Sequence, residues 1–312
     1  MTAQIELKRR IDVRNEQFVE RITAALKRNY FSNSPPDYLE SAEGKKDLLD
    51  HVIFRYQMFA DFYVPWLLSR YDLSPMRIVE IGSGTGCSTL AFAPVVKSID
   101  CYELSVGSTE VAKERLGFWA IENVTFHPEL FDARVAKHRE GGKLDAVLLC
   151  ACLEHMTHEE CLTVLSICWK MIRPGGILIV AETPNRFSMI DEHSSWLPLF
   201  SMLPREIQIA YAGRSPREGF RTVIANALKK GKGIEAMTRW GSGVSFHEFE
   251  IAIGNEVHDL ITLNGYEPEM TSFFPVTKID KMLQIVFQRF RIKANIAFTR
   301  RNLNFVVQKP AE

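Results

Sequence analysis

A short glycine-rich stretch is the part of this 312-residue sequence most clearly suited to chemistry. Gly82, Gly84 and Gly86 alternate with small polar residues, directly after an apolar run over 77–81 and before a helical pattern over 88–93. Glycines permit a sharp turn and place no Cβ between the main chain and a ligand, while N–H groups at a helix start face the polar groups of that ligand. The pattern predicts a loop that holds a nucleotide-like molecule at a strand end.

An acidic residue about twenty positions further on strengthens this prediction. Glu103 ends the next apolar run, 98–103, where a carboxylate can accept hydrogen bonds from both hydroxyl groups of a ribose. The alternative is a solvated charge at a strand end. The loop and the acid together favour a ribose-bearing ligand.

Two histidines are placed to remove a proton from an acceptor. His155 follows the apolar run 144–150, and His193 follows the run 177–181. Open α/β sheets bind ligands beyond the carboxyl ends of their strands, which is where both histidines are expected. Helix capping or packing is the alternative role for His155. For His193 the alternative is a loop histidine satisfied by neighbouring carboxylates.

Strand patterns alternate with helical patterns through the middle of the chain. The short apolar runs are 77–81, 98–103, 123–127, 144–150 and 177–181, and a final one covers 303–307. This alternation indicates an α/β fold with a mostly parallel sheet covered by helices on both faces. Apolar residues at helical spacing before residue 75 predict a helical N-terminal segment. Prolines and aromatic residues after the fifth run predict a helical lid.

We therefore expect four parts: a helical segment over 1–75, a core over 76–185, a lid over 186–245 and a C-terminal completion of the sheet over 246–312. The last part is expected to begin with a helix around 247–263. The lid is more apolar than an exposed loop should be. It is expected either to pack on the N-terminal helices or to close over an apolar or lipid-linked substrate.

Composition limits the partners and the setting. Lys plus Arg and Asp plus Glu number 38 each, so no overall charge attracts nucleic acid, and none is expected to bind. The six cysteines cluster between positions 87 and 168, which favours reduced, buried thiols. We expect a cytoplasmic protein, because the start shows no apolar signal region.

A basic amphipathic stretch over 278–301 is expected to pack on the core, with peripheral membrane contact as the alternative. No pattern indicates an oligomeric state.

The stretch from about residue 77 to 184 resembles class I S-adenosylmethionine-dependent methyltransferases. The loop from Glu80 to Gly86 is similar to their first motif, Glu103 to their ribose-binding acid, and 172–178 to the turn before their fifth strand. The resemblance implies a Rossmann-like, seven-stranded, mostly parallel sheet whose last strand is antiparallel. It also implies S-adenosylmethionine as the methyl donor and S-adenosylhomocysteine as the product.

The resemblance also assigns a cofactor site. Asp132 is expected at the adenine amino group with Phe131 alongside it, although Glu129 fits equally well and either acid is also suited to cap a helix. The expected cofactor-binding residues are Glu80, Gly82, Ser83, Gly84, Gly86, Glu103, Leu104, Phe131, Asp132 and Cys150.

Two further segments bear on the acceptor. Residues 153–155 resemble ubiquinone-biosynthesis O-methyltransferases, in which a glutamate three positions before the Glu-His pair helps to bind a metal. Ala151 occupies that place here, so no metal ion is expected to be required. Residues 183–186 resemble a segment of bacterial methyltransferases that act on small molecules, glycans or their lipid-linked precursors.

These resemblances favour O-methylation of such an acceptor, with His155 or His193 as the general base. A nicotinamide-dependent oxidoreductase is one alternative, although its usual glycine spacing differs from the one found here. A non-catalytic module that retains the fold is the other alternative.

Overall fold

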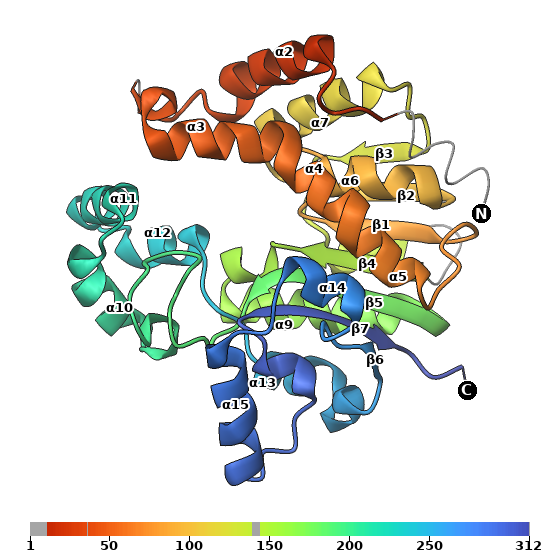
Figure 1. The fold of residues 1–312 in the computed structure, drawn as a ribbon, viewed down its shortest axis with the longest axis vertical. Coiled ribbons are helices and arrows are strands. Elements are labelled where there is room, and N and C mark those ends of the chain that lie inside the picture. Colours follow the sequence, from red (N-terminus) through yellow and green to blue (C-terminus); the bar gives the residue numbers. More distant parts are fainter. Residues whose placement is uncertain (1–10, 36, 139–143, 312) are drawn as a thin grey trace. The chain divides into compact units, whose positions relative to one another are not determined.

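The computed structural model describes residues 11–35, 37–138 and 144–311. Its strands are β1 (Arg77–Ile81), β2 (Ser98–Tyr102), β3 (Val124–His127), β4 (Leu144–Cys150), β5 (Ile172–Pro184), β6 (Ile261–Leu263) and β7 (Asn302–Gln308). They form one sheet in the order β3-β2-β1-β4-β5-β7-β6 (Figure 1). β2 runs parallel to β1 and β3, whereas β7 runs antiparallel to β5 and β6. The predicted Rossmann-like sheet with an antiparallel last strand is confirmed.

The described chain divides into two compact units. The first contains residues 11–131 together with Leu144–Leu148 and Pro268–Phe273, and the second contains 132–138, 149–267 and 274–311. Strands β1 to β3 and most of β4 therefore belong to the first unit, and β5 to β7 belong to the second.

The N-terminal part of the first unit is helical, as the apolar spacing predicts. Asn15 caps the first helix by accepting a hydrogen bond from the backbone of Phe18, and the helix buries Phe18 and Ile22. The elements are α2 (Glu16–Ala25), η1 (Leu26–Tyr30), η2 (Tyr38–Glu40), α3 (Ala42–Leu49), η3 (Asp50–Phe54), α4 (Arg55–Met58), η4 (Phe59–Tyr63) and α5 (Val64–Leu68). Of these, η1, η3 and η4 are π-helical, a form that often occurs at functional sites.

Among its described residues, the first unit contains four further helical segments. They are α6 (Cys87–Phe92), η5 (Ala93–Val95), α7 (Val106–Phe118) and α14 (Pro268–Phe273). Ser105 caps α7 by accepting a hydrogen bond from Ser108 N. The side chain of Arg115, on the buried face of α7, is fully enclosed.

The second unit packs helices on β5 and on one another. These elements are α8 (Ala133–His138), η6 (Leu153–His155), α9 (His158–Met171), α13 (Phe246–Ile253), η9 (Asn255–His258), α15 (Lys278–Arg289) and η10 (Ile296–Thr299). α9 packs on β5 and on α13. Phe249 on α13 and Phe305 on β7 are fully buried, with ring centroids 5.0 Å apart.

The helix predicted over 247–263 is wrong in its second half. α13 ends at Ile253 because Gly254 has a φ of 121°, outside the helical region. After the short turn η9, residues Ile261–Leu263 form β6 instead and pair with β7. Ile261 and Leu263 stand two positions apart, which is the period of a strand, and they pair with the edge of β7.

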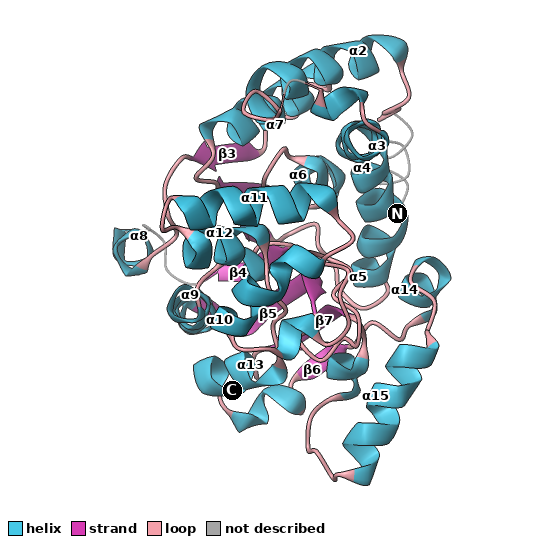
Figure 2. Ribbon diagram, turned by 90° about the vertical axis from the view of Figure 1, so that its left-hand side faces the viewer, coloured by secondary structure: helices cyan, strands magenta, loops and turns pink. Residues whose placement is uncertain are grey.

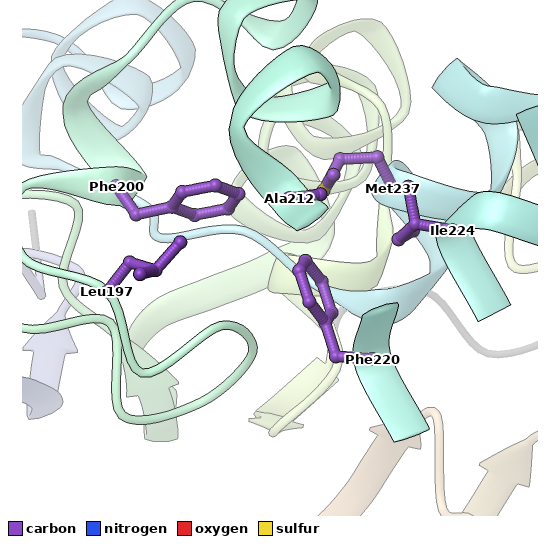
Figure 3. Packing of buried hydrophobic residues seen from close by; sticks show 6 residues of the cluster. All are labelled: Leu197, Phe200, Ala212, Phe220, Ile224 and Met237. Atoms are coloured by element: carbon purple, nitrogen blue, oxygen red, sulfur yellow. The ribbon is translucent and has the colours of Figure 1, made fainter. Parts of the chain in front are cut away.

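The lid has a hydrophobic core of its own. Its elements are η7 (Phe200–Met202), α10 (Arg205–Tyr211), η8 (Ala212–Arg214), α11 (Glu218–Lys229) and α12 (Gly233–Trp240). Helices α10 and α11 both pack on α12 (Figure 2). The buried side chains between them are Leu197, Phe200, Ala212, Phe220, Ile224 and Met237 (Figure 3). The lid is therefore an ordered substructure.

The basic amphipathic stretch packs inward on one face only. Leu283 and Phe287 on α15 are buried, whereas Met282, Ile285 and Phe290 are exposed. Packing against the core, the role expected for this stretch, thus holds for one face. None of the helices among the described residues is both long enough and apolar enough to cross a membrane.

Candidate active site

The glycine loop follows β1 in the first unit, as predicted. Gly82, Gly84 and Gly86 have φ values of 73°, 52° and 78°, a left-handed region that side chains with a Cβ rarely adopt. Gly82 N donates to Tyr102 O at 2.8 Å, and Gly86 N donates to Ser83 O at 3.0 Å. The backbone thus turns sharply from β1 into α6.

Gly84 and Gly86 are glycines for different reasons. A Cβ built on Gly84 would meet no atom within 4 Å, so this part of the loop borders open space. A Cβ on Gly86 would lie 2.8 Å from Ala112 Cβ and 3.0 Å from Ala112 Cα, on α7. Gly86 therefore lets a helix pack against the loop, whereas Gly84 leaves room for a ligand.

Glu103 is held beside this loop. One carboxylate oxygen accepts a hydrogen bond from Gly84 N at 2.9 Å, and the other accepts one from Ser105 N at 2.7 Å. Each oxygen of a carboxylate has two lone pairs, so both can still accept ribose hydroxyl hydrogens. The half-buried Glu103 and the open space over Gly84 fit the ribose and the polar end of S-adenosylmethionine.

Glu80 contributes from inside the fold. It is fully buried, and its carboxylate accepts hydrogen bonds from the hydroxyls of Ser88 and Thr89 at the start of α6. Burial raises the pKa of Glu80. The residue therefore fixes the path from β1 to α6 and shapes the loop between them.

Three residues beside the loop, Tyr30, His51 and Arg115, were not predicted from the sequence. The Nδ1 atom of His51 lies 3.1 Å from Thr85 Oγ1, and its ring centroid lies 4.6 Å from that of Tyr30. Burial lowers the pKa of His51 to about 3, and the guanidinium groups of Arg55 and Arg115 act in the same direction. His51 is therefore a neutral imidazole at physiological pH.

Arg115 joins the loop to the N-terminal helices. Its guanidinium donates to Thr85 O at 2.9 Å and to His51 O at 2.6 Å. Tyr30 and His51 lie on the π-helical turns η1 and η3, and Arg115 lies within α7. No sequence motif marks these positions, because their proximity arises from helix packing.

The other residues expected at the adenine end differ in their surroundings. Phe131 is buried, with its ring centroid 4.9 Å from that of Tyr102. The carboxylate of Asp132 accepts hydrogen bonds from Arg134 N at 2.7 Å and Val135 N at 3.1 Å, so it caps α8. Capping was one of the two roles considered for this acid. Ser83 and Cys150 are buried, whereas Leu104 is 66% exposed.

In the second unit, both candidate bases lie in one cluster. His155 ends the short turn η6 after β4, and His193 lies in the lid after β5. Their ring centroids are 5.4 Å apart. Glu154, which is 1% exposed, completes the group, and His155 Nε2 lies 3.9 Å from Glu154 Oε1. The structure thus unites the two histidines that the sequence offered as alternatives.

The hydrogen bonding of His155 determines which of its nitrogens is basic. Nδ1 lies 2.9 Å from the carbonyl oxygen of Arg239, at the end of α12. A carbonyl can only accept, so Nδ1 carries the proton and Nε2 of the neutral ring holds the lone pair. Arg239 also donates to His155 O at 2.9 Å and forms two 2.8 Å hydrogen bonds with Glu160. These bonds lower the pKa of Glu160 to about 2.

His193 is held by the lid backbone. Its carbonyl oxygen accepts a hydrogen bond from Arg217 at 2.9 Å. Its ring lies against Gly241, where φ is 123° and a Cβ would come 2.5 Å from His193 Nε2 and 3.3 Å from His155 Cε1. A glycine at 241 is therefore a condition for the two rings to share this space.

The polar segment after β5 connects the lid to the C-terminal part. Asn185 donates to the carbonyl oxygens of Phe298 and Arg300, both at 2.7 Å. Arg186 pairs with Glu248, the residue that also forms a capping box with Ser245 at the start of α13. Residues 185 and 186 thus have structural partners within the second unit.

Comparison with known proteins finds similarity to the central part of the chain. A family model described as a methyltransferase domain matches residues 79–178. The highly reducing polyketide synthase azaB of Aspergillus niger is 29% identical over 160 residues, which cover 44% of this chain and 6% of that protein. The chain therefore spans only a small part of this curated relative.

Three solved structures with partial similarity to this chain are described as methyltransferases. A S-adenosylmethionine-dependent methyltransferase from Clostridium acetobutylicum is 13% identical, with a TM-score of 0.39 over 50% of this chain and 63% of that one. The magnesium protoporphyrin IX methyltransferase ChlM from Synechocystis, solved with bound SAH, is 20% identical, with a TM-score of 0.38 over 54% and 75%. The amino pentose methyltransferase CalS10 from Micromonospora echinaspora is 23% identical, with a TM-score of 0.32 over 40% and 50%.

Proposed function

We propose that the chain is a class I S-adenosylmethionine-dependent methyltransferase that methylates a hydroxyl oxygen of a small molecule, a glycan or a lipid-linked precursor. When bound, the cofactor supplies an electrophilic methyl group on a sulfonium sulfur. The protein has to hold the donor, align the acceptor with it and remove the hydroxyl proton.

Cofactor binding is assigned to the loop after β1 and the acid after β2. The open space over Gly84 allows the ligand to approach the backbone, and Glu103 is positioned to accept the ribose hydroxyl hydrogens. Tyr30 and His51 form the neighbouring wall through their mutual ring contact and the contact of His51 with Thr85.

Proton removal is assigned to Nε2 of His155. The observation that supports this choice is the 2.9 Å contact of Nδ1 with the Arg239 carbonyl, which fixes the tautomer whose Nε2 is basic. A histidine with this tautomer is suited to act near neutral pH. His193, whose ring adjoins that of His155, is assigned to hydrogen-bond and orient the acceptor.

The test begins with formation of S-adenosylhomocysteine from a panel of phenols, glycosides and polyprenyl-linked sugars, with matched amines for comparison. With the best hydroxyl acceptor, His155→Ala should lower turnover about a hundredfold or more and leave cofactor affinity unchanged. The control is His158→Ala, which changes a histidine side chain that is 68% exposed. Unchanged turnover in His155→Ala, or a preference for the amines, would contradict the proposal.

A further inference from the structure

The cluster that holds the proposed base also has the composition of a metal site. Glu154, His155 and His193 each offer one ligand atom, and these atoms all lie within 4.8 Å of one another. Two imidazole nitrogens and one carboxylate oxygen form the three-ligand set that binds Zn²⁺ while leaving a fourth position open. We propose that this cluster binds one borderline divalent cation, such as Zn²⁺ or Co²⁺.

The geometry requires only a local adjustment. Bonds of about 2.0–2.2 Å in a tetrahedral site place ligand atoms roughly 3.4 Å apart, so the ion would draw these three together by about 1 Å. Both imidazole rings are partly exposed, so neither is enclosed in a fully packed core. In the described part of the chain, this is the one such group of His, Cys, Asp or Glu side chains.

The other nitrogen of His155 supports this assignment. Metal-binding histidines usually donate their second ring N–H to a carbonyl or carboxylate, which fixes the tautomer and the ring orientation. Nδ1 of His155 makes that contact with Arg239 O at 2.9 Å, so Nε2 is the nitrogen that would bind an ion. The arrangement that suits a general base therefore suits a metal ligand equally well.

The carboxylate of Glu154 would supply a negative charge to the bound cation. At 1% exposure its carboxylate has almost no contact with water, and a divalent cation would compensate a negative charge in such a place. The expectation that no metal is required was based on Ala151, which stands where the related enzymes have a metal-binding glutamate. The structure provides a different third ligand, His193 from the lid.

The consequence for the reaction rests on the proposed function. An ion bound to His155 Nε2 occupies the lone pair that would accept the hydroxyl proton. The cation therefore inhibits methyl transfer, and a chelator restores it. Activity without metal and inhibition by metal are both consistent with a base that doubles as a ligand.

Cobalt titration of the full-length protein, freed of metal with EDTA and dialysed, tests binding directly. We expect the visible absorption of four-coordinate Co²⁺ to appear and to saturate at one ion per chain. His193→Ala and Glu154→Gln should each weaken Co²⁺ binding about tenfold or more, whereas His158→Ala should not. Gly241→Ala, which displaces the His193 ring, should also weaken it. Circular dichroism verifies that each variant is folded.

The outcomes separate this proposal from the function assigned above. Absence of a Co²⁺ spectrum in the wild type, or equal binding by folded His193→Ala, would overturn the metal site even if methyl transfer is observed. Stoichiometric Co²⁺ binding would stand even if His155 proved not to be the base. Where binding is observed, turnover that is unaffected or raised by the ion would overturn the inhibitory role.

Discussion

Gly84 and Gly86 stand two positions apart in one loop, yet an added methyl group would act differently at each. At Gly84 the methyl group would enter open space that we assign to the cofactor, whereas at Gly86 it would collide with Ala112 on α7. The sequence indicates a glycine loop but does not distinguish these roles. The difference depends on which helix packs behind the loop.

We predict opposite profiles for the two alanine variants. Gly84→Ala should reduce stability by only about 1–2 kcal/mol, the cost of a left-handed backbone, but should lower cofactor affinity at least tenfold. Gly86→Ala should lose several kcal/mol of stability, because the collision involves α7 backbone as well. Urea unfolding and calorimetry measure the two effects.

The control for this pair is Gly117→Ala, in the exposed part of α7, where no atom lies within 4 Å of the added Cβ. It should stabilise the protein by up to about 1 kcal/mol and leave cofactor affinity unchanged. Gly84→Ala with normal affinity would show that the cofactor does not approach this part of the loop.

At the scale of elements, strands were easier to predict than the contacts that helices make. β1 and β4 occur over the predicted residues because both short runs are rich in aliphatic residues. The π-helical turns that bring Tyr30 and His51 to the loop have no sequence signal of comparable strength. The lid was predicted as helical, but its internal core becomes visible only when α10, α11 and α12 are packed together.

That core yields a prediction about the lid. Phe220 is fully buried within it, so Phe220→Ala should cost about 3–5 kcal/mol of local stability and loosen the lid. Turnover should fall while cofactor affinity is retained, since the cofactor loop belongs to the other unit. Hydrogen exchange in residues 196–240 reports the loosening. Ile234→Ala, at a side chain that is 58% exposed, is the matched control, and an equal effect there would contradict a specific role of the lid core.

At the scale of the whole molecule, the first unit depends on a histidine that is buried in its neutral form. The ordinary pKa of His51 is 6.5, and in the folded protein it falls to about 3. Between these values the unfolded chain binds a proton that the folded chain does not, so stability decreases as pH falls. Glu80 acts in the opposite sense, because its raised pKa favours the folded state at low pH.

We therefore predict that acid destabilises the wild type more than His51→Gln. The difference between the two should grow as pH falls from 6.5 towards 3, by at most about 1.4 kcal/mol per pH unit. Comparing the two proteins cancels the contribution of Glu80. Parallel stability curves over this range would show that His51 is protonated in the folded state.

The sequence could predict most of the strands and the position of the glycine loop, since both follow from local patterns. It could not predict that His155 and His193 lie together, because they come from segments after different strands and meet only through Gly241. The expectation of a cytoplasmic location stays a prediction, and membrane contact through 278–301 stays an alternative. The acceptor also stays a prediction, because its recognition depends on side chains that no family motif specifies.

The most direct test of the central claim is calorimetry of S-adenosylhomocysteine binding to the wild type and to Glu103→Ala, with NADH as the competing ligand. We predict that S-adenosylhomocysteine binds the wild type and that Glu103→Ala weakens it by roughly 1–3 kcal/mol, the value of charge-assisted hydrogen bonds to the ribose. Glu110→Ala, on the exposed face of α7, should bind normally. Binding of NADH in place of S-adenosylhomocysteine, or equal affinity in Glu103→Ala, would contradict the account.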